Sequence, residues 1–168
     1  SAVLLFRTWI HISMTTDTPQ VLGWREWVGF PDIGIPKVKA KVDTGARTSS
    51  LHAFTVEPFE RDGKQWVRFD MHPLQLNNSE VISCEAPLLG QRNVRDSGGH
   101  EELRYVIETT ITIGESRLKA EVTLTDRDTM KFRVLLGRTA IRGSFLVDSG
   151  RSYLRGKKNP SIKRQRKA

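Results

Sequence analysis

The sequence predicts an all-β domain, folded as a closed or partly open barrel with one short helix near its end. Three observations predict this class. Apolar and polar residues alternate along many short segments, as they do in strands with one buried face. Turn signals rich in glycine, proline and aspartate separate these segments at regular spacing, which is typical of β-barrels. Only residues 138–142 have a pattern suited to a helix, and that helix would be one or two turns long.

The composition divides the chain into a neutral domain and a basic tail. Residues 151–168 hold eight Lys and Arg residues and no acidic residue, whereas residues 1–150 hold 19 basic and 19 acidic residues. We expect residues 1–20 to be disordered or derived from upstream sequence, 21–154 to form one barrel domain, and 155–168 to be a flexible basic tail. The tail could contact the ribosome or RNA, or it could only increase solubility.

Two features bear on the compartment. The single cysteine, Cys84, excludes an internal disulfide and fits a reducing environment, and a buried apolar role is favoured over a reactive thiol. The longest apolar run, near residues 2–6, is far shorter than the roughly 20 residues of a membrane-spanning helix. We therefore expect a cytoplasmic protein without a membrane partner.

The elements follow from alternation and turn chemistry in chain order. Asp62-Gly63 and Gly114 mark two hairpin turns. The segment Gln91–Glu102 is polar and contains adjacent glycines, so we expect a loop there. Strands are predicted at residues 21–30, 38–42, 51–59, 65–71, 81–89, 105–113, 118–124, 130–136, 145–147 and 153–154.

The most informative stretch is Val38–Thr48. It alternates apolar and polar residues up to Val42 and then places Asp43, Thr44 and Gly45 at the strand's end. A glycine in such a turn lets another backbone approach closely. A second signal comes late in the chain, directly before the expected helix, and consists of Leu135, Leu136, Gly137 and Arg138.

These two motifs, in this order, resemble those of the bacterial retropepsin-like aspartic peptidases, long described as putative ATP-dependent zinc proteases. The similarity covers residues 21–154 and is carried by residues 41–53, 102–107, 126–131 and 134–138. The resemblance implies an acid-protease barrel with Asp43, Thr44 and Gly45 as the catalytic loop, supported by Leu135, Leu136, Gly137 and Arg138. One branch, the RimB proteins, removes glutamates that a partner ligase adds to a small-subunit ribosomal protein. The resemblance therefore implies a peptidase that hydrolyses glutamate-rich tails.

The residues do not support the zinc and ATP in the older family description. The chain has no Gly-Lys-Ser/Thr phosphate loop and no His-Glu-x-x-His motif. Its four histidines, at positions 11, 52, 72 and 100, lack the paired spacing of metal ligands. We expect no cofactor and no metal site, and a zinc-dependent peptidase is the least favoured alternative.

Aspartic peptidases need two carboxylates that share one proton. Asp96 and Asp148 also begin Asp-Ser-Gly tripeptides. Asp96 follows a polar stretch and nothing after Asp148 can form a second lobe, so both are more consistent with turns. We therefore predict a homodimer with one Asp43 per subunit, in which Thr44 joins the two loops by hydrogen bonds.

Three further residues are candidates for substrate binding. Arg47 occupies the position after Asp-Thr-Gly-Ala where viral retropepsins carry an acid, and it suits carboxylate recognition or a structural ion pair. The segment Gln91–Glu102 could cover the substrate, with Arg95 and His100 touching it, or it could be an ordinary exposed loop. Arg138 is expected to pair with an acid. The remaining alternative is a non-catalytic ribosome-binding or RNA-binding barrel.

Overall fold

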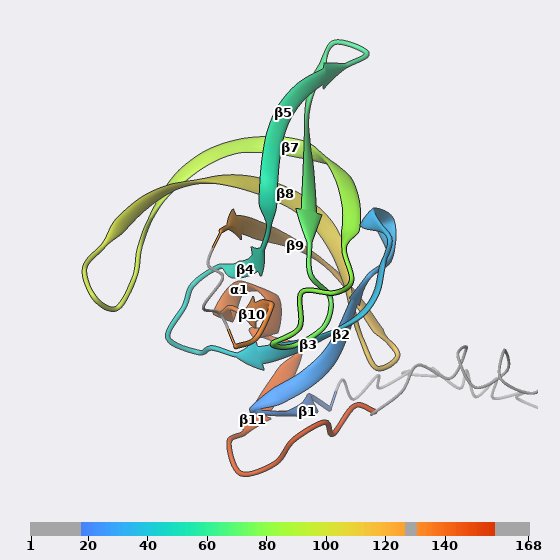
Figure 1. Ribbon diagram of the computed structural model, residues 1–168. Coiled ribbons are helices and arrows are strands. Elements are labelled where there is room, and N and C mark those ends of the chain that lie inside the picture. Colours follow the sequence, from blue (N-terminus) through green and yellow to red (C-terminus); the bar gives the residue numbers. More distant parts are fainter. Residues whose placement is uncertain (1–17, 127–130, 157–168) are drawn as a thin grey trace, which may run out of the picture.

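The computed structural model describes residues 18–126 and 131–156, which are almost entirely β-structure (Figure 1). The only helices in these ranges are a 3-10 turn, η1 (Pro31–Ile33), and α1 (Arg138–Ile141), which directly follows the Leu-Leu-Gly motif. The predicted all-β class with one short helix is confirmed. The strands are β1 (Gln20–Gly23), β2 (Arg25–Phe30), β3 (Ile35–Val42), β4 (Ser49–His52), β5 (Phe54–Arg61), β6 (Lys64–Met71), β7 (Ile82–Arg95), β8 (Glu101–Ile113), β9 (Ser116–Thr125), β10 (Val134–Leu136) and β11 (Phe145–Asp148).

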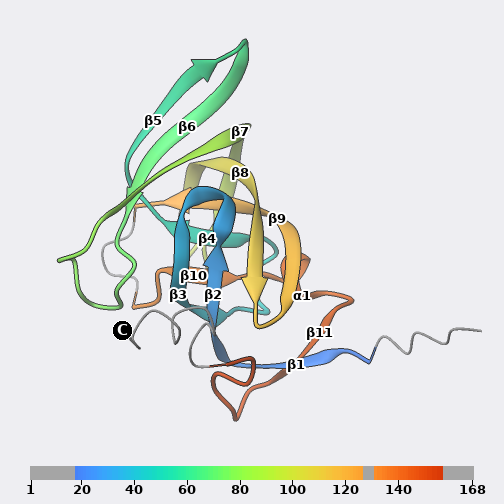
Figure 2. The ribbon, with the colours of Figure 1, turned by 90° about the vertical axis from the view of Figure 1, so that its right-hand side faces the viewer.

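Nine strands form one sheet in the order β2-β3-β10-β4-β9-β8-β7-β6-β5. Because β2 also pairs with β8, through Val28 opposite Ile113 and Gly29 opposite Thr112, the strands from β2 to β8 close into a ring. Strands β5 and β6 continue the sheet beyond the ring and project from the barrel as a hairpin arm (Figure 2). Strands β1 and β11 form a separate parallel ribbon.

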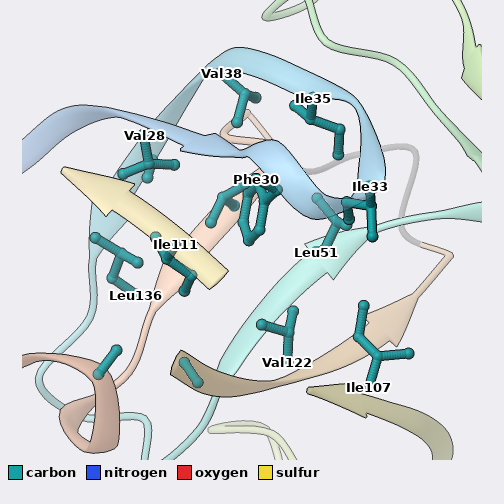
Figure 3. Close-up of a cluster of buried hydrophobic side chains, with 14 of the residues drawn as sticks. Val28, Phe30, Ile33, Ile35, Val38, Leu51, Ile107, Ile111, Val122 and Leu136 are labelled. Carbon is teal, nitrogen blue, oxygen red and sulfur yellow. The ribbon is translucent and has the colours of Figure 1, made fainter. Parts of the chain in front are cut away.

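Alternation along the strands builds the core inside the ring. In β3, Val38, Ala40 and Val42 are buried, and lysines occupy the positions between them. Side chains from several strands and η1 meet in the interior (Figure 3). Each fully buried aliphatic or aromatic side chain of this kind contributes about 1.5–3 kcal/mol relative to its exposed state. The core therefore fixes the ends of β3 and β10, which carry the two motifs.

Several segments differ from the expectation, among them the strand predicted at 51–59, which is divided at Ala53 into β4 and β5. The strand predicted at 21–30 is broken at Trp24, whose N–H donates to the Arg151 carbonyl, 2.8 Å away, so that β1 pairs with β11. Residues 153–154 are not a strand, because the Leu154 N–H donates to the buried Glu26 carboxylate at 2.8 Å. The predicted loop 91–102 is largely the end of the β7–β8 hairpin, and only residues 96–100 form its turn.

Some predictions concern residues outside the described ranges. Residues 1–17 include most of the predicted N-terminal segment, and 157–168 include most of the basic tail. The predicted role of the tail in RNA or ribosome contact therefore stays a prediction.

Candidate active site

The Asp43 turn lies where the chain passes around the end of β10. Strand β10 sits between β3, with which it is parallel, and β4, with which it is antiparallel. The Asp43 N–H donates to the Leu136 carbonyl at 2.9 Å, which joins the first motif to the second. The Ala46 N–H donates to the Asp43 carbonyl at 3.2 Å and closes the turn.

Gly137 allows a close approach between the two motifs. A Cβ atom at Gly137 would lie 2.5 Å from the carbonyl carbon of Thr48, a distance that no side chain tolerates. Its N–H donates to the buried Ser49 Oγ at 3.0 Å. The glycine is thus required by backbone packing, since its own φ of −85° is open to any residue.

The start of α1 holds the turn from the other side. The Arg138 N–H donates to the Ala46 carbonyl at 2.9 Å, and the Thr139 N–H donates to the Arg47 carbonyl at 3.0 Å. These are N–H groups of the first helical turn, which have no partner inside a helix. The Arg138 guanidinium donates to the Thr44 carbonyl at 3.0 Å. Within the described ranges Arg138 makes no ion pair with an acid, so its support acts through this carbonyl and differs from the predicted pairing.

Asp43 itself is half-buried, and Thr44 and Gly45 after it are exposed. Asp43 Oδ1 accepts a hydrogen bond from the Gly45 N–H at 3.0 Å. This bond holds the carboxylate at the mouth of the turn. A carboxylate held by a backbone donor at an exposed turn is able to accept a proton from water or to share one with a second carboxylate.

The two other Asp-Ser-Gly sites serve their own turns. Asp96 Oδ1 accepts from the N–H groups of Gly98 and His100, each at 2.9 Å. Asp148 Oδ1 accepts from the Gly150 N–H at 2.9 Å. Both arrangements are Asx turns, in agreement with the turn interpretation made from the sequence. Asp43 forms the same Asx contact with Gly45, and what distinguishes it is the bonding of its turn to β10 and α1.

A polar cavity of about 470 Å³ lies beside the Asp43 turn and includes Arg47. Its lining also contains Thr48, Arg92, Glu108, Lys119, Glu121 and Thr139. Arg92 and Glu121 of the lining form an ion pair, with Nη2 and Oε2 2.8 Å apart. Sequence reasoning missed Arg92 and Lys119, whose only sequence signal is an outward position on an alternating strand.

Arg95 and His100, the other predicted substrate contacts, lie at the closed end of the β7–β8 hairpin. Arg95 Nη2 is 2.6 Å from Glu101 Oε1, and the His100 side chain is 84% exposed. Neither residue lines the cavity beside the Asp43 turn. In Figure 1 the hairpin extends well beyond the barrel. Their contact with substrate, like that of Arg47, stays a prediction.

The histidines of β4 and of the segment after β6, and the single cysteine, lie outside the Asp43 turn. His52 is buried and His72 stacks on Phe54 with ring centroids 4.4 Å apart. In residues 18–126 and 131–156 no three His, Cys, Asp or Glu side chains are grouped as metal ligands. Burial, assisted by the charge of Asp70, raises the pKa of the Cys84 thiol to about 12, which keeps it unreactive at neutral pH.

One finding bears on membranes. Among the helices of the described ranges, none has the length and apolar character needed to cross a bilayer.

A barrel whose Asp-Thr-Gly turn is tied by hydrogen bonds to a Leu-Leu-Gly strand defines a retropepsin-like protein. A family model described as "RimB-like: Retropepsin-like aspartic endopeptidase RimB" matches residues 21–158. The chain belongs to this family, as the sequence motifs predicted. A solved structure from Legionella pneumophila, a protein Lpg0085 with unknown function, shares the fold with a TM-score of 0.70 and 26% identity. That match covers 81% of this chain and 98% of the Legionella chain.

Curated relatives have a different kind of name. A Shewanella pealeana protein is 43% identical over 85% of this chain, and a Parasynechococcus marenigrum protein is 48% identical over 81% of it. Both are named "Probable alpha-L-glutamate ligase". The chain spans only 31% and 29% of these relatives, less than a third of their length.

The relatives' names contradict the function predicted from the sequence. That prediction was a homodimeric aspartic peptidase that hydrolyses glutamate-rich tails such as that of a ribosomal protein. A ligase joins its substrates, whereas a peptidase hydrolyses them, and four matching relatives are named as glutamate ligases. The prediction failed because residues 1–168 contain the peptidase-like motifs but not the remaining two thirds of the relatives. What holds is coarser: the chain is a domain from a family of enzymes.

Proposed function

We propose that the chain is a hydrolytic domain of the aspartic type, in which Asp43 supplies one of the two carboxylates that activate water. The observation that carries the proposal is the Asp43 turn itself. It is held by its N–H donation to the Leu136 carbonyl and by the N–H groups of Arg138 and Thr139, which donate to carbonyls of the turn. Asp96 and Asp148 only cap their own turns, whereas the turn of Asp43 is bonded to the second motif, as a hydrolytic site built from both motifs needs. The family match over residues 21–158 supports the same chemistry.

The second carboxylate would come from Asp43 of another copy of the domain. Two carboxylates at about 3 Å share one proton, because both cannot ionise at that distance. The ionised member then takes a proton from water, and the protonated member polarises the amide carbonyl. Thr44 and Gly45 are exposed beside Asp43, as a contact between two such turns requires.

A second candidate function follows from the relatives' names. The domain could serve an α-L-glutamate ligase without chemistry of its own, for example by holding a substrate for the rest of the protein. The observation that favours it is the 43–48% identity with proteins of that name, of which this domain is less than a third.

Substitution of Asp43 by Asn separates the two candidates. The full chain and its Asp43→Asn variant are incubated with a peptide library, and new termini are measured by mass spectrometry. We expect cleavage by the wild type and its loss by a factor of about 10³ or more in the variant, because Asn cannot exchange a proton with water. Asp62→Asn is the matched control, since this carboxylate lies in the exposed turn between β5 and β6 and its loss should leave cleavage unchanged.

Two results would contradict the hydrolytic proposal. One is cleavage by Asp43→Asn at the wild-type rate. The other is absence of cleavage together with a stimulation by the domain of glutamate ligation in a protein of the relatives' kind, unchanged by Asp43→Asn. Circular dichroism spectra of the variants would verify that each is folded.

A further inference from the structure

The outer part of the β7–β8 hairpin is paired with no other described strand. Strand β8 pairs with β9 only from Val106 onward, whereas residues 101–105 pair with β7 alone. The register of the hairpin shifts between Leu88 and Gly90, directly opposite the point where β8 leaves β9, and Gly90 has a φ of +151°. Such a shift bends a strand locally. Side chains therefore have to fix the outer part of the hairpin relative to the barrel.

Arg104 and Glu102 of β8 make this connection to β9. Arg104 is only 7% exposed, and a cation buried to this extent needs partners. Its Nε donates to Glu102 Oε2 at 2.9 Å, and its Nη1 donates to Thr123 Oγ1 at 3.5 Å. The same Glu102 oxygen accepts from Thr125 Oγ1 at 3.2 Å. The ion pair of the hairpin is thus bonded to two hydroxyl groups of β9.

The connection continues from β9 to the two sequence motifs through Ser49. The Thr123 Oγ1 donates to the Ser49 carbonyl at 3.4 Å. Ser49 is fully buried and begins β4, shortly after the Asp43 turn. Its Oγ accepts from the Gly137 N–H at 3.0 Å. A chain of hydrogen bonds therefore runs from Arg104 to the glycine at which the two motifs make their closest contact.

A second arginine of the hairpin reaches the same segment. Arg92 of β7 lies directly opposite Arg104 in the strand pairing. Its Nη1 donates to Thr48 Oγ1 at 3.5 Å, and its Nη2 pairs with Glu121 of β9. Two neighbouring strands of the hairpin thus converge on residues 48–49, the chain segment that leaves the Asp43 turn.

We propose that Arg104 is a positioning residue of the hydrolytic site, which ties the β7–β8 hairpin to Ser49 and thereby to the Asp43 turn. Its effect on catalysis rests on the proposed function, whereas the connection itself does not require hydrolysis. Arg104 does not line the cavity beside the Asp43 turn, so it acts through Thr123 and Ser49 and not by contact with substrate. A displacement of about 1 Å at a catalytic group can lower a rate by about 10²-fold, so even a small shift of the turn is measurable.

Hydrogen exchange, measured by NMR, tests the connection without a substrate. Arg104→Met removes the guanidinium and keeps an apolar stem in its place. We expect exchange at the Gly137 amide to accelerate several-fold relative to amides of the β8–β9 pairing, which report on global unfolding. Arg95→Met is the matched control, because Arg95 also pairs with a glutamate of the hairpin, Glu101, at 2.6 Å. Exchange at Gly137 should not change in this control.

Kinetics with a peptide that the wild type cleaves tests the effect on catalysis. Arg104→Met should lower kcat by about tenfold and change KM by less than about twofold, because Arg104 positions the site without binding substrate. Thr123→Val keeps the shape of the side chain and removes the hydroxyl that joins Arg104 to Ser49. In the Thr123→Val background, Arg104→Met should lower kcat by less than about twofold further, since the connection is already broken. Urea denaturation verifies that each variant is folded.

Three outcomes would overturn the inference. They are unchanged exchange at Gly137 in Arg104→Met, losses of kcat in the two single variants that multiply in the double variant, and an effect of Arg104→Met confined to KM. If the wild type cleaves no peptide, the proposed function fails, and the exchange rates at Gly137 alone decide whether Arg104 positions the turn.

Discussion

At the scale of single residues, the close contact between Gly137 and the Thr48 backbone predicts that a larger side chain at position 137 destabilises the protein. Gly137→Ala places a Cβ atom 2.5 Å from Thr48 backbone, so the two motifs must separate. We expect a loss of about 1–3 kcal/mol in the free energy of unfolding, the usual cost of overpacking, together with loss of the activity assigned to Asp43. Urea denaturation measures the stability. In the control, Gly98→Ala, the added atom would meet Asp96 Oδ1 at 3.4 Å, an ordinary contact. Equal stability of the two variants would contradict this account.

Sequence reasoning at this scale found the Asp43 turn and the Leu-Leu-Gly motif but not their surroundings. Asp43, Thr44 and Gly45 carry a signal in three adjacent letters. The cavity beside them also depends on Arg92 and Lys119, which come from β7 and β9 and meet Arg47 only through sheet pairing. No local pattern distinguishes these two outward cations from other surface charges. The acid partner predicted for Arg138 failed similarly, because a backbone carbonyl fills that role.

At the scale of elements, one buried carboxylate fastens the end of the described chain to β2. Glu26 Oε1 accepts from the N–H groups of Gly23 and Leu154, and Oε2 accepts from the Arg155 N–H. Glu26→Gln replaces one acceptor oxygen by a donor that faces another donor. We expect unfolding free energy to fall by about 1–3 kcal/mol and hydrogen exchange at Leu154 and Arg155 to accelerate. Glu57→Gln, at an exposed position in β5, is the control. Equal exchange rates in both variants would refute the role.

Most strands could be predicted, since polar and apolar residues alternate in the sequence of a strand that has one exposed and one buried face. The strand boundaries were predicted wrongly where they depend on pairing between segments that are distant in the sequence. Trp24 looks like the middle of a strand, yet its N–H turns to Arg151, more than a hundred residues away. Residues 91–95 are polar except for Val94 and looked like a loop, yet they pair with residues 101–105, and Asp96 caps the turn between them.

At the scale of the whole molecule, the β1–β11 ribbon is the feature the sequence could least predict. Its two strands lie more than a hundred residues apart in the chain and pair in parallel, from Gln20 opposite Phe145 to Gly23 opposite Asp148. The Val42 N–H donates to the Trp24 carbonyl at 2.9 Å, so the ribbon begins at the same end of the barrel as Asp43. A two-stranded ribbon leaves one edge of each strand unpaired, and such edges pair readily with another chain.

A second copy of the domain could therefore dock on this ribbon and bring its own Asp43 close. Leu146 on β11 is 58% exposed, an apolar residue in the place where such an interface would bury it. Leu146→Glu should shift the protein toward monomer in sedimentation velocity and reduce hydrolysis in proportion, because the dyad needs both copies. Leu89→Glu, at a site 53% exposed on β7, should change neither. If Leu146→Glu stayed fully active while sedimenting as a monomer, the second carboxylate would have to come from within the same chain, and the pairing of two Asp43 turns would be refuted.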